Sequence, residues 1–369
     1  QVVNSICICS KKRLNIMLKR SSVLFLVILF VVGSMSAARK PKNVIFLIGD
    51  GMGLAQIYSA MVANGNSLEL ERCQYVGLSK TYSTDNYTTD SAAGATAMST
   101  GVKTRNGMIG MGPDSVVVET ILEQASRNGL ATGMVVACAL THATPASFIA
   151  HQVDREWNEE IAVDYLKTNI DVFIGGGKRY FDKRSDGRSL VNELKAKDYQ
   201  IAYTLDEVKS IKEGKVAGLL FDNHPEAMPN RGRYLTEATQ KTIDLLRKNK
   251  KGFFMMVEGS QIDWGGHNND NNMIIREMLD FDTTVGQVLD FAKKNRRTLV
   301  IITADHETGG LSLPSGNMEK RYSEAVFSTG GHTGIPVPVF AFGPGAEEFT
   351  GIMENTEFKG KIAKLLKLE

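Results

Sequence analysis

Six continuous apolar runs are the strongest pattern along the chain. They cover residues 44–48, 133–140, 172–174, 253–257, 299–302 and 337–342. Unbroken hydrophobicity over so few residues is typical of strands that are buried on both faces, as in parallel sheets. Between them, residues 117–128, 235–249 and 274–294 have the spacing of amphipathic helices. This alternation predicts an α/β protein, a three-layer α/β/α sandwich with a central, mostly parallel sheet.

Residues 178–218 are more polar than the rest of the chain, and we expect them to lie on the rim of the sheet, outside its strands. The stretch begins with GGGKRYF, which is too short for a phosphate-binding loop of the GxxxxGK[ST] kind. This segment therefore adds no nucleotide site to the prediction.

The first 38 residues have the layout of a targeting segment. After Met17 come Lys19 and Arg20, an apolar run over residues 23–32, and small residues that end at Ala38. This order is typical of a secretory signal peptide, and the run is shorter than the roughly 20 residues of a spanning helix. We expect an extension and signal peptide over 1–38, a single domain over 39–369, and an exported protein without stable membrane insertion. A retained anchor is the alternative.

Composition excludes several classes of protein. The chain is 43% hydrophobic and 23% charged, which excludes a disordered, collagen-like or polytopic membrane protein. The net charge of +2 owes much to basic residues before residue 39, so no nucleic-acid partner is expected. Export would permit a disulfide between Cys73 and Cys138. The apolar run around Cys138 favours a buried free thiol instead.

Polar side chains follow four of the predicted strands. Ligands of open α/β sheets bind beyond the carboxyl ends of the strands, so these side chains are expected to meet on one rim. In chain order they are Asp50; His142 and Thr144; Glu258, Asp263 and His267; and Asp305 and His306.

The types of side chain indicate metals. Imidazole and carboxylate without thiolate suit Zn, and this description fits Asp263, His267 and His306. His332 lies in a similar Gly-rich setting, STGGHTG. An all-oxygen set of Asp50, Thr144 and Glu258 suits Mg better. His151 and His224 lack such a context and are interpreted as structural.

Ser91 follows Asp90 at the head of a small-residue helix over residues 92–100. Either residue can be interpreted as the N-cap of the helix. Ser91 can also be interpreted as a nucleophile at the positive end of the helix. The sequence leaves both open. No GxSxG motif is present around Ser91, so a metal is the expected activator. Arg155 suits phosphate recognition but is also a common surface cation.

These segments together resemble the alkaline phosphatases. The resemblance rests on six blocks in the order of that family, from about residue 43 to 343: NVIFLIGDGMG, TTDSAAGATAMSTGVKT, THATPASFIAHQVDR, VEGSQIDWGGHNN, TADHETGG and GGHTG. It implies hydrolysis of phosphate monoesters of broad leaving-group range, with two Zn ions, one Mg ion and a homodimer.

The resemblance also implies roles for matching residues. Ser91 would become phosphoserine, and Arg155 would hold the phosphate. One Zn would bind Asp263, His267 and His332, and the second would bind Asp50, Asp305 and His306. Mg would bind Asp50, Thr144 and Glu258, with Asp50 shared between two sites.

Two positions vary within this family, and both are expected to line the phosphate site. His142 stands where many bacterial members have Asp, and this weakens the case for a tightly held Mg. Trp264 stands where they have Lys, and this leaves Arg155 as the main side-chain anchor. Residues 309–331 have little room for the large insertion of some members, so we expect an open site.

Two alternatives remain. A phosphodiesterase of the same superfamily is one, whereas a sulfatase would need a C/S-x-P-x-R motif that is absent around Ser91. The other is a non-catalytic zinc- or phosphate-binding protein.

Overall fold

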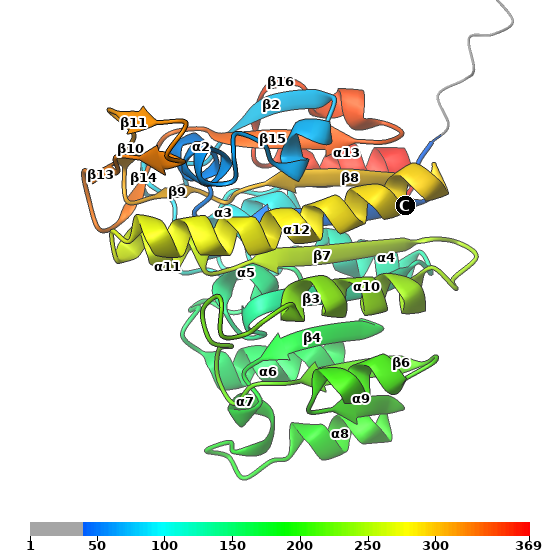
Figure 1. Cartoon of the computed structure of the whole chain (residues 1–369). Helices are drawn as coiled ribbons and strands as arrows, with labels where there is room; N and C mark the ends of the chain where they lie inside the picture. The colour runs from blue at the N-terminus through cyan, green and yellow to red at the C-terminus, as the bar shows by residue number, and fades with distance from the viewer. Residues whose placement is uncertain (1–39) are drawn as a thin grey trace, which may run out of the picture. The chain divides into compact units, whose positions relative to one another are not determined.

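A ten-stranded sheet forms the centre of residues 40–369, the part of the chain that the computed structural model describes (Figure 1). The predicted signal segment over 1–38 lies outside the described residues. Across the sheet the strands follow the order β16 (Gly351–Glu354), β2 (Tyr75–Lys80), β15 (Val337–Phe342), β8 (Thr298–Thr303), β1 (Asn43–Gly49), β7 (Phe253–Gly259), β3 (Ala131–Ala139), β4 (Val172–Gly176), β6 (Lys215–Leu219) and β5 (Tyr199–Ala202).

Most neighbouring strands are parallel, as predicted. Strand β1 pairs in parallel with both β7 and β8, and β3 does so with β7 and β4. The exception is β15, which is antiparallel to β2 and to β8. All six predicted apolar runs are strands, because each is buried on both faces along most of its length.

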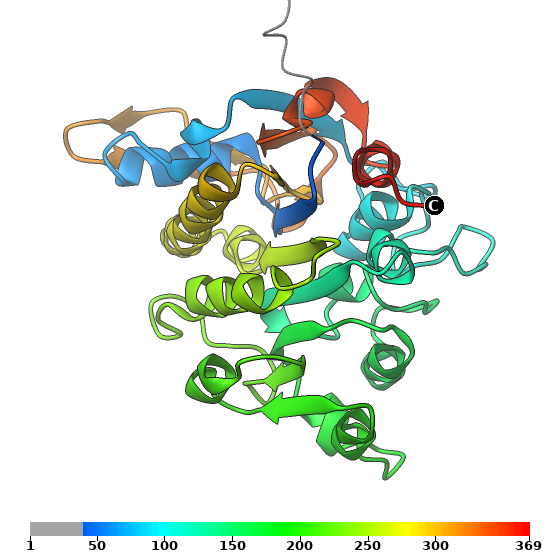
Figure 2. The same cartoon turned by 90° about the vertical axis from the view of Figure 1, so that its right-hand side faces the viewer.

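Helices cover both faces of the sheet, which confirms the three-layer α/β/α prediction. Figure 2 shows α12 in yellow on one side of the sheet and α13 in red on the other. The helices are α2 (Leu54–Ala63), α3 (Ser91–Thr100), α4 (Ile121–Arg127), α5 (Ala143–Ala146), α6 (Asn158–Lys167), α7 (Arg179–Asp182), α8 (Leu190–Ala196), α9 (Leu205–Ser210), α10 (Tyr234–Leu246), α11 (Ile262–His267), α12 (Asn271–Asn295) and α13 (Glu357–Leu366), with 3₁₀ turns η1 (Glu69–Arg72) and η2 (Ala346–Phe349).

Strand β1 divides its side chains between two hydrophobic cores. Phe46 and Ile48 pack with the core beneath α3, α4 and α13, whereas Ile45 and Leu47 pack with the core beneath α10 and α12. Alternate residues of a strand point to opposite faces, so a strand between two helical layers must be apolar at every position. This burial places the carboxyl end of β1 in the middle of the protein.

The polar segment 178–218 was predicted as rim decoration, and this prediction was wrong. It contains α7, α8, β5, α9 and β6, and its two strands extend the sheet in parallel beyond β4. The reason is that β5 is a short edge strand with one exposed and one half-buried residue, so it lacks the continuous apolar run of a central strand.

Small antiparallel ladders lie at the carboxyl end of β8. Strand β9 (Glu307–Thr308) pairs with β14 (His332–Thr333), so two distant histidine-bearing segments lie side by side. Between them, β10 (Leu311–Ser312) pairs with β13 (Val326–Phe327), and β11 (Gly316–Asn317) pairs with β12 (Tyr322–Ser323).

No helix within residues 40–369 combines the length and the apolar character that crossing a bilayer requires.

In the same range, Cys73 and Cys138 are free and buried.

Candidate metal centre and active site

The predicted polar side chains meet at the carboxyl ends of four adjacent strands, β8, β1, β7 and β3. Asp50 directly follows β1, and Glu258 is the next-to-last residue of β7. Asp305 and His306 follow β8, and Thr144 lies in α5 just after β3. Each of these five residues is at most 1% exposed. The sheet therefore gathers titratable groups in a buried region, where they cannot be solvated by water.

Gly51 allows the end of β1 to approach α11. Its φ of +72° is a left-handed conformation that favours glycine, and a Cβ atom there would lie 2.7 Å from the Cα of Asp263. The Gly51 N–H donates to Asp305 Oδ1 at 3.3 Å. A side chain at this position would push the end of β1, and with it Asp50, away from Asp263.

The first cluster consists of Asp263, His267 and His332. His267 Nε2 lies 3.3 Å from Asp263 Oδ2, His332 Nε2 lies 3.5 Å from Asp263 Oδ1, and the two Nε2 atoms are 3.1 Å apart. Each imidazole uses Nδ1 to contact a backbone carbonyl, that of Gly330 or that of Thr89. This orients both Nε2 atoms toward one point, as in metal sites whose ligands are held by backbone contacts.

The second cluster lies around His306. Its Nε2 atom is 3.5 Å from Asp50 Oδ1, 3.3 Å from Asp305 Oδ2 and 3.1 Å from Ser91 Oγ. Ligand atoms of Asp50, Asp263 and His306 lie within 4.8 Å of one another, so this cluster adjoins the first one. The hydroxyl of Ser91 therefore lies at the second cluster.

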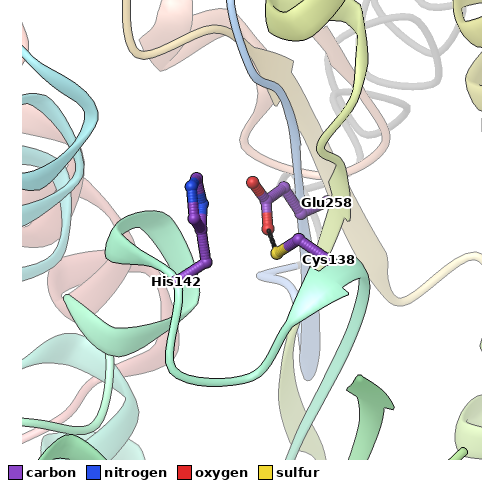
Figure 3. A group of neighbouring side chains, drawn as sticks. All are labelled: Cys138, His142 and Glu258. Atoms are coloured by element: carbon purple, nitrogen blue, oxygen red, sulfur yellow. Dashed lines mark hydrogen bonds between the residues drawn. The ribbon is translucent and has the colours of Figure 1, made fainter. Parts of the chain in front are cut away.

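The third cluster consists of Cys138 of β3, His142 and Glu258 (Figure 3). Thr144 of α5 lies beside Glu258 and lowers the pKa of its carboxyl group, against the larger effect of burial. The Cys138 thiol donates to Glu258 Oε2 at 3.3 Å. Glu258 Oε1, Thr144 Oγ1 and His142 Nδ1 are buried and make no hydrogen bond. Trp264 packs edge-on against His142 and His224, with ring centroids 6.3 and 4.8 Å away, and His224 accepts from the Ala139 N–H.

These clusters fit metal ions. Both carboxylate oxygens of Asp50, Oδ2 of Asp305 and Oε1 of Glu258 are buried without a hydrogen bond. Buried carboxylates without partners are costly, and coordination of a cation removes that cost. The first two clusters offer imidazole and carboxylate, which suit Zn, and the third offers hard oxygens in Asp50, Thr144 and Glu258, which suit Mg.

Burial and mutual repulsion perturb the carboxyl groups strongly. Burial, with the charge of Asp263 added, raises the pKa of Asp305 to about 7. Burial also raises the pKa of Glu258 to about 8, and raises that of Asp50 well above its usual range. Asp263 behaves differently: burial is outweighed by its hydrogen bond with His267 and by nearby imidazoles, and its pKa is lowered. Perturbations of this kind are typical of functional sites.

The imidazoles also differ from one another. The hydrogen bond with Asp263 raises the pKa of His267 to about 9, whereas burial lowers the pKa of His306 well below its usual range. Burial lowers the pKa of His142 to about 3. Neutral imidazole is the form that binds metal, and the lowered pKa values keep His142 and His306 in this form at neutral pH.

Helix α3 presents Ser91 to this region. Asp90 is its N-cap and accepts from the Ala93 N–H at 2.9 Å, so Ser91 is the first residue of the helix. Asp90 Oδ2 also accepts from Arg155 Nη1 at 3.0 Å and from the Gly107 N–H at 2.9 Å. The structure thus places Arg155 beside the positive end of the helix that carries Ser91, where an anion is favoured.

Sequence reasoning missed three contacts here. It treated Asp90 only as a cap, it treated Cys138 as an inert core residue, and it did not single out Thr308. The Thr308 hydroxyl donates to Asp263 Oδ1 and lies 3.2 Å from His306 Nδ1, so it links the first two clusters. The only indication of Thr308 in the sequence was its position in the segment ETGG, residues 307–310, directly after His306.

Comparison with known proteins identifies the family. The family model described as alkaline phosphatase matches residues 41–322. Alkaline phosphatase 3 of Bacillus subtilis is 35% identical over 88% of this chain and 89% of its own length. The alkaline phosphatase of Escherichia coli is 33% identical over 87% and 85%. The solved alkaline phosphatase of the Antarctic bacterium TAB5 is 44% identical and covers 90% of this chain and 99% of its own, with a TM-score of 0.85.

The chain belongs to the alkaline phosphatase family. It is a phosphatase that hydrolyses phosphate monoesters, and the family is metal-dependent. A His-to-Asp variant of the TAB5 enzyme, solved with Mg bound in a site called M3, matches with 43% identity and the same TM-score.

Proposed function

We propose that Ser91 is the nucleophile of this phosphatase and forms a phosphoserine intermediate, with two Zn ions and one Mg ion as cofactors. The single observation that carries the proposal is the convergence of Ser91 Oγ and the carboxylates of Asp50 and Asp305 on His306 Nε2. A serine hydroxyl is a weak nucleophile near neutral pH unless a base or metal activates it.

The ligand sets follow the three clusters. Asp263, His267 and His332 would hold one Zn, and Asp50, Asp305 and His306 the other. Asp50, Thr144 and Glu258 would hold Mg. Two Zn ions near each other supply charge neutralisation for the phosphate, the attacking oxygen and the leaving oxygen. The observation that supports metal ions at these positions is the set of buried carboxylate oxygens that make no hydrogen bond.

The remaining groups of the site hold the substrate. Arg155 would bind two phosphate oxygens with its guanidinium, and the N-terminus of α3 would stabilise the negative charge that stays on the phosphoryl group. Ser91 would lose its hydroxyl proton to solvent, and its Oγ would attack phosphorus in line with the leaving oxygen. The bond from phosphorus to that oxygen would break, and the alkoxide would take a proton from solvent to leave as the alcohol. A water molecule would then attack the phosphoserine from the opposite side, which would release inorganic phosphate and return a proton to Ser91 Oγ. Trp264 and His142 would line the phosphate site without adding a positive charge, because the pKa of His142 is lowered by burial.

The proposal is tested by Ser91→Ala. This variant should lose turnover of p-nitrophenyl phosphate by on the order of a thousandfold or more, since the nucleophile is lost. It should also trap no acid-stable phosphoenzyme. Ser99→Ala is a matched control at the other end of α3, where the hydroxyl donates to the Ser147 carbonyl. Covalent labelling of Ser91→Ala by phosphate would point to another nucleophile.

A substrate panel separates the alternatives. We expect p-nitrophenyl phosphate to be hydrolysed much faster than bis(p-nitrophenyl) phosphate or p-nitrophenyl sulfate, because the clusters and Arg155 suit a dianion. Preference for the diester would support a phosphodiesterase, and failure to turn over any of the three would support a non-catalytic binding protein.

The organisation of the whole protein is proposed on the family resemblance. We propose that residues 39–369 are a single catalytic domain that works as an exported, periplasmic or extracellular homodimer. Sedimentation of the purified protein and fractionation of expressing cells test these two points. A monomer at micromolar concentration, or a cytoplasmic protein, would contradict them.

A further inference from the structure

The third cluster contains a sulfur atom that the ligand set proposed for Mg does not use. Cys138 lies near the end of β3, where it is fully buried, and its thiol has two acceptors within reach, the Ala139 carbonyl at 3.2 Å and Glu258 Oε2 at 3.3 Å (Figure 3). Glu258 extends from the neighbouring strand β7, and His142 reaches the same place from the turn before α5. Three different types of ligand therefore face one another at this point.

The distances suit a metal ion. One ligand atom each from Cys138, His142 and Glu258 lies within 4.8 Å of the other two. An ion at the centre of such a triangle is no more than about 2.8 Å from each atom, and Zn–ligand distances of about 2.0–2.3 Å need only small side-chain movements.

Two atoms of this cluster have no other partner. His142 Nδ1 and Glu258 Oε1 are buried and make no hydrogen bond, although Glu258 is 0% exposed. A buried thiol by itself would be interpreted as an ordinary core residue. Here an imidazole and a carboxylate without hydrogen-bond partners lie beside it, so the three groups together form a possible ligand set. Imidazole, carboxylate and thiolate together suit Zn²⁺ or Co²⁺, whereas Mg²⁺ requires hard oxygen ligands.

We propose that Cys138, His142 and Glu258 form a second ligand set within the third metal site, which binds a thiophilic divalent ion such as Zn²⁺ or Co²⁺ in competition with Mg²⁺. The proposal rests on the third site of the proposed function, with Glu258 common to both sets. When such an ion binds, the proton of the Cys138 thiol is released to solvent and the thiolate becomes the ligand. Occupancy of the third site then depends on the ratio of the two kinds of ion.

The test uses Co²⁺ as the probe, because a thiolate bound to Co²⁺ gives a charge-transfer absorption in the near ultraviolet that oxygen and nitrogen ligands do not give. The parent protein is the full chain with Cys7→Ser and Cys9→Ser, which removes the two cysteines outside the described residues. It is freed of metal, reloaded with Co²⁺ at fixed excess Mg²⁺, and analysed by absorption and by metal content per chain.

We expect the parent to show the sulfur-to-cobalt absorption and to retain Co²⁺ in the third site. Cys138→Ser should lose the absorption and bind Co²⁺ there at least about tenfold more weakly, with Mg²⁺ taking its place. Cys73→Ser is the matched control, a buried free thiol that follows η1, and it should keep both signals.

The parent spectrum needs no core substitution, so the test does not depend on the folding of Cys138→Ser. Absence of the absorption in a parent that binds Mg²⁺ and hydrolyses phosphate monoesters overturns the thiolate set and leaves the proposed function intact. An absorption that persists in Cys138→Ser overturns it as well. A parent that binds neither metal would contradict the metal sites of the proposed function instead.

Discussion

Asp90 is the residue on which Ser91 and Arg155 both depend. One carboxylate oxygen caps α3, and the other accepts from Arg155 and from the Gly107 N–H. The Arg155 side chain is 22% exposed and that of Asp90 is 20% exposed, so the ion pair is largely shielded from water. Asp90 is thus a positioning residue that holds the guanidinium beside the helix that presents Ser91.

Two substitutions separate these roles of Asp90. Asp90→Asn keeps a good N-cap, but its amide nitrogen cannot accept from Arg155 or from the Gly107 N–H. We therefore expect a modest loss of thermal stability, together with a KM and phosphate inhibition constant that rise about three- to tenfold because Arg155 must be ordered by the ligand. Asp90→Ala should also lose about 1 kcal/mol of stability from the cap. Kinetics with phosphate as inhibitor and thermal melts measure both.

Asp154→Asn is the control for this prediction, since Asp154 is adjacent to Arg155 and its side chain accepts only from the Glu156 N–H. An Asp90→Asn protein with an unaltered phosphate inhibition constant would show that Arg155 needs no positioning partner.

At the residue scale, sequence reasoning located side chains better than it located contacts. Asp50, Glu258 and Asp305 were found because each lies at or just after the end of an apolar strand, and the strand ends meet on one rim. The contact between Cys138 and Glu258 joins residues 120 positions apart on paired strands. Such a contact depends on the register of β3 and β7, which no local pattern fixes.

At the scale of elements, the central strands could be predicted, and the outer strands β2, β16 and β5 could not. Strands β1, β3, β7 and β8 are buried on both faces, and this produces continuous apolar runs. Strands β2 and β16 mix buried and solvent-accessible residues, so they resemble loops in sequence. The helix predicted over 117–128 begins instead at Ile121, because Thr120 and Glu123 form a capping box there.

A pH-dependent contact attaches α4 to the loop that leads to Arg155. His151 Nε2 lies 2.9 Å from Glu123 Oε1, and His151 Nδ1 lies 2.7 Å from the Gly110 carbonyl. Burial lowers the pKa of His151, but the hydrogen bond and charge of Glu123 and the Gly110 carbonyl outweigh it, and the pKa is raised. A raised histidine pKa stabilises the fold fully below the unfolded value near 6.5, and this stabilisation is lost as the pH rises through the folded value.

We therefore expect the wild type to lose stability relative to His151→Gln as the pH rises from about 6.5 through the raised pKa of the folded state, because only the wild type has the ion pair to lose. The difference should be less than about 1 kcal/mol, as for other partly exposed pairs. Melting temperatures of both proteins across this range measure it. A constant difference would mean that the imidazole stays in one protonation state.

At the scale of the whole molecule, the proposed metal sites join segments that are far apart in the sequence. Asp50 and His332, the first and last residues of the proposed ligand set, lie just after β1 and on β14. Ions that bind only the folded state stabilise it, by about 2.7 kcal/mol per site at a hundredfold excess over Kd. The metals of this protein are therefore expected to support its fold as well as its chemistry.

Removal of metal by chelation should abolish hydrolysis of p-nitrophenyl phosphate and lower the melting temperature by several degrees, since the buried carboxylates lose their neutralising cations. Zn and Mg added back together should restore both properties, and either ion alone should restore them only in part. Full activity and an unchanged melting temperature after verified metal removal would contradict the metal mechanism.

The ladder of β9 with β14 has a consequence for protein engineering. It pairs Thr308 with His332 and Glu307 with Thr333, and two further ladders of the same length pair the chain segments that lie between these residues. The exposed tip near Met318 is thus tethered at its base, so lengthening it costs only about 0.6 kcal/mol per doubling of its length. A binding peptide grafted at that tip would leave His306 and His332, the proposed ligands on either side, in register, which makes the hairpin a natural attachment point for fusing recognition modules to a reporter enzyme.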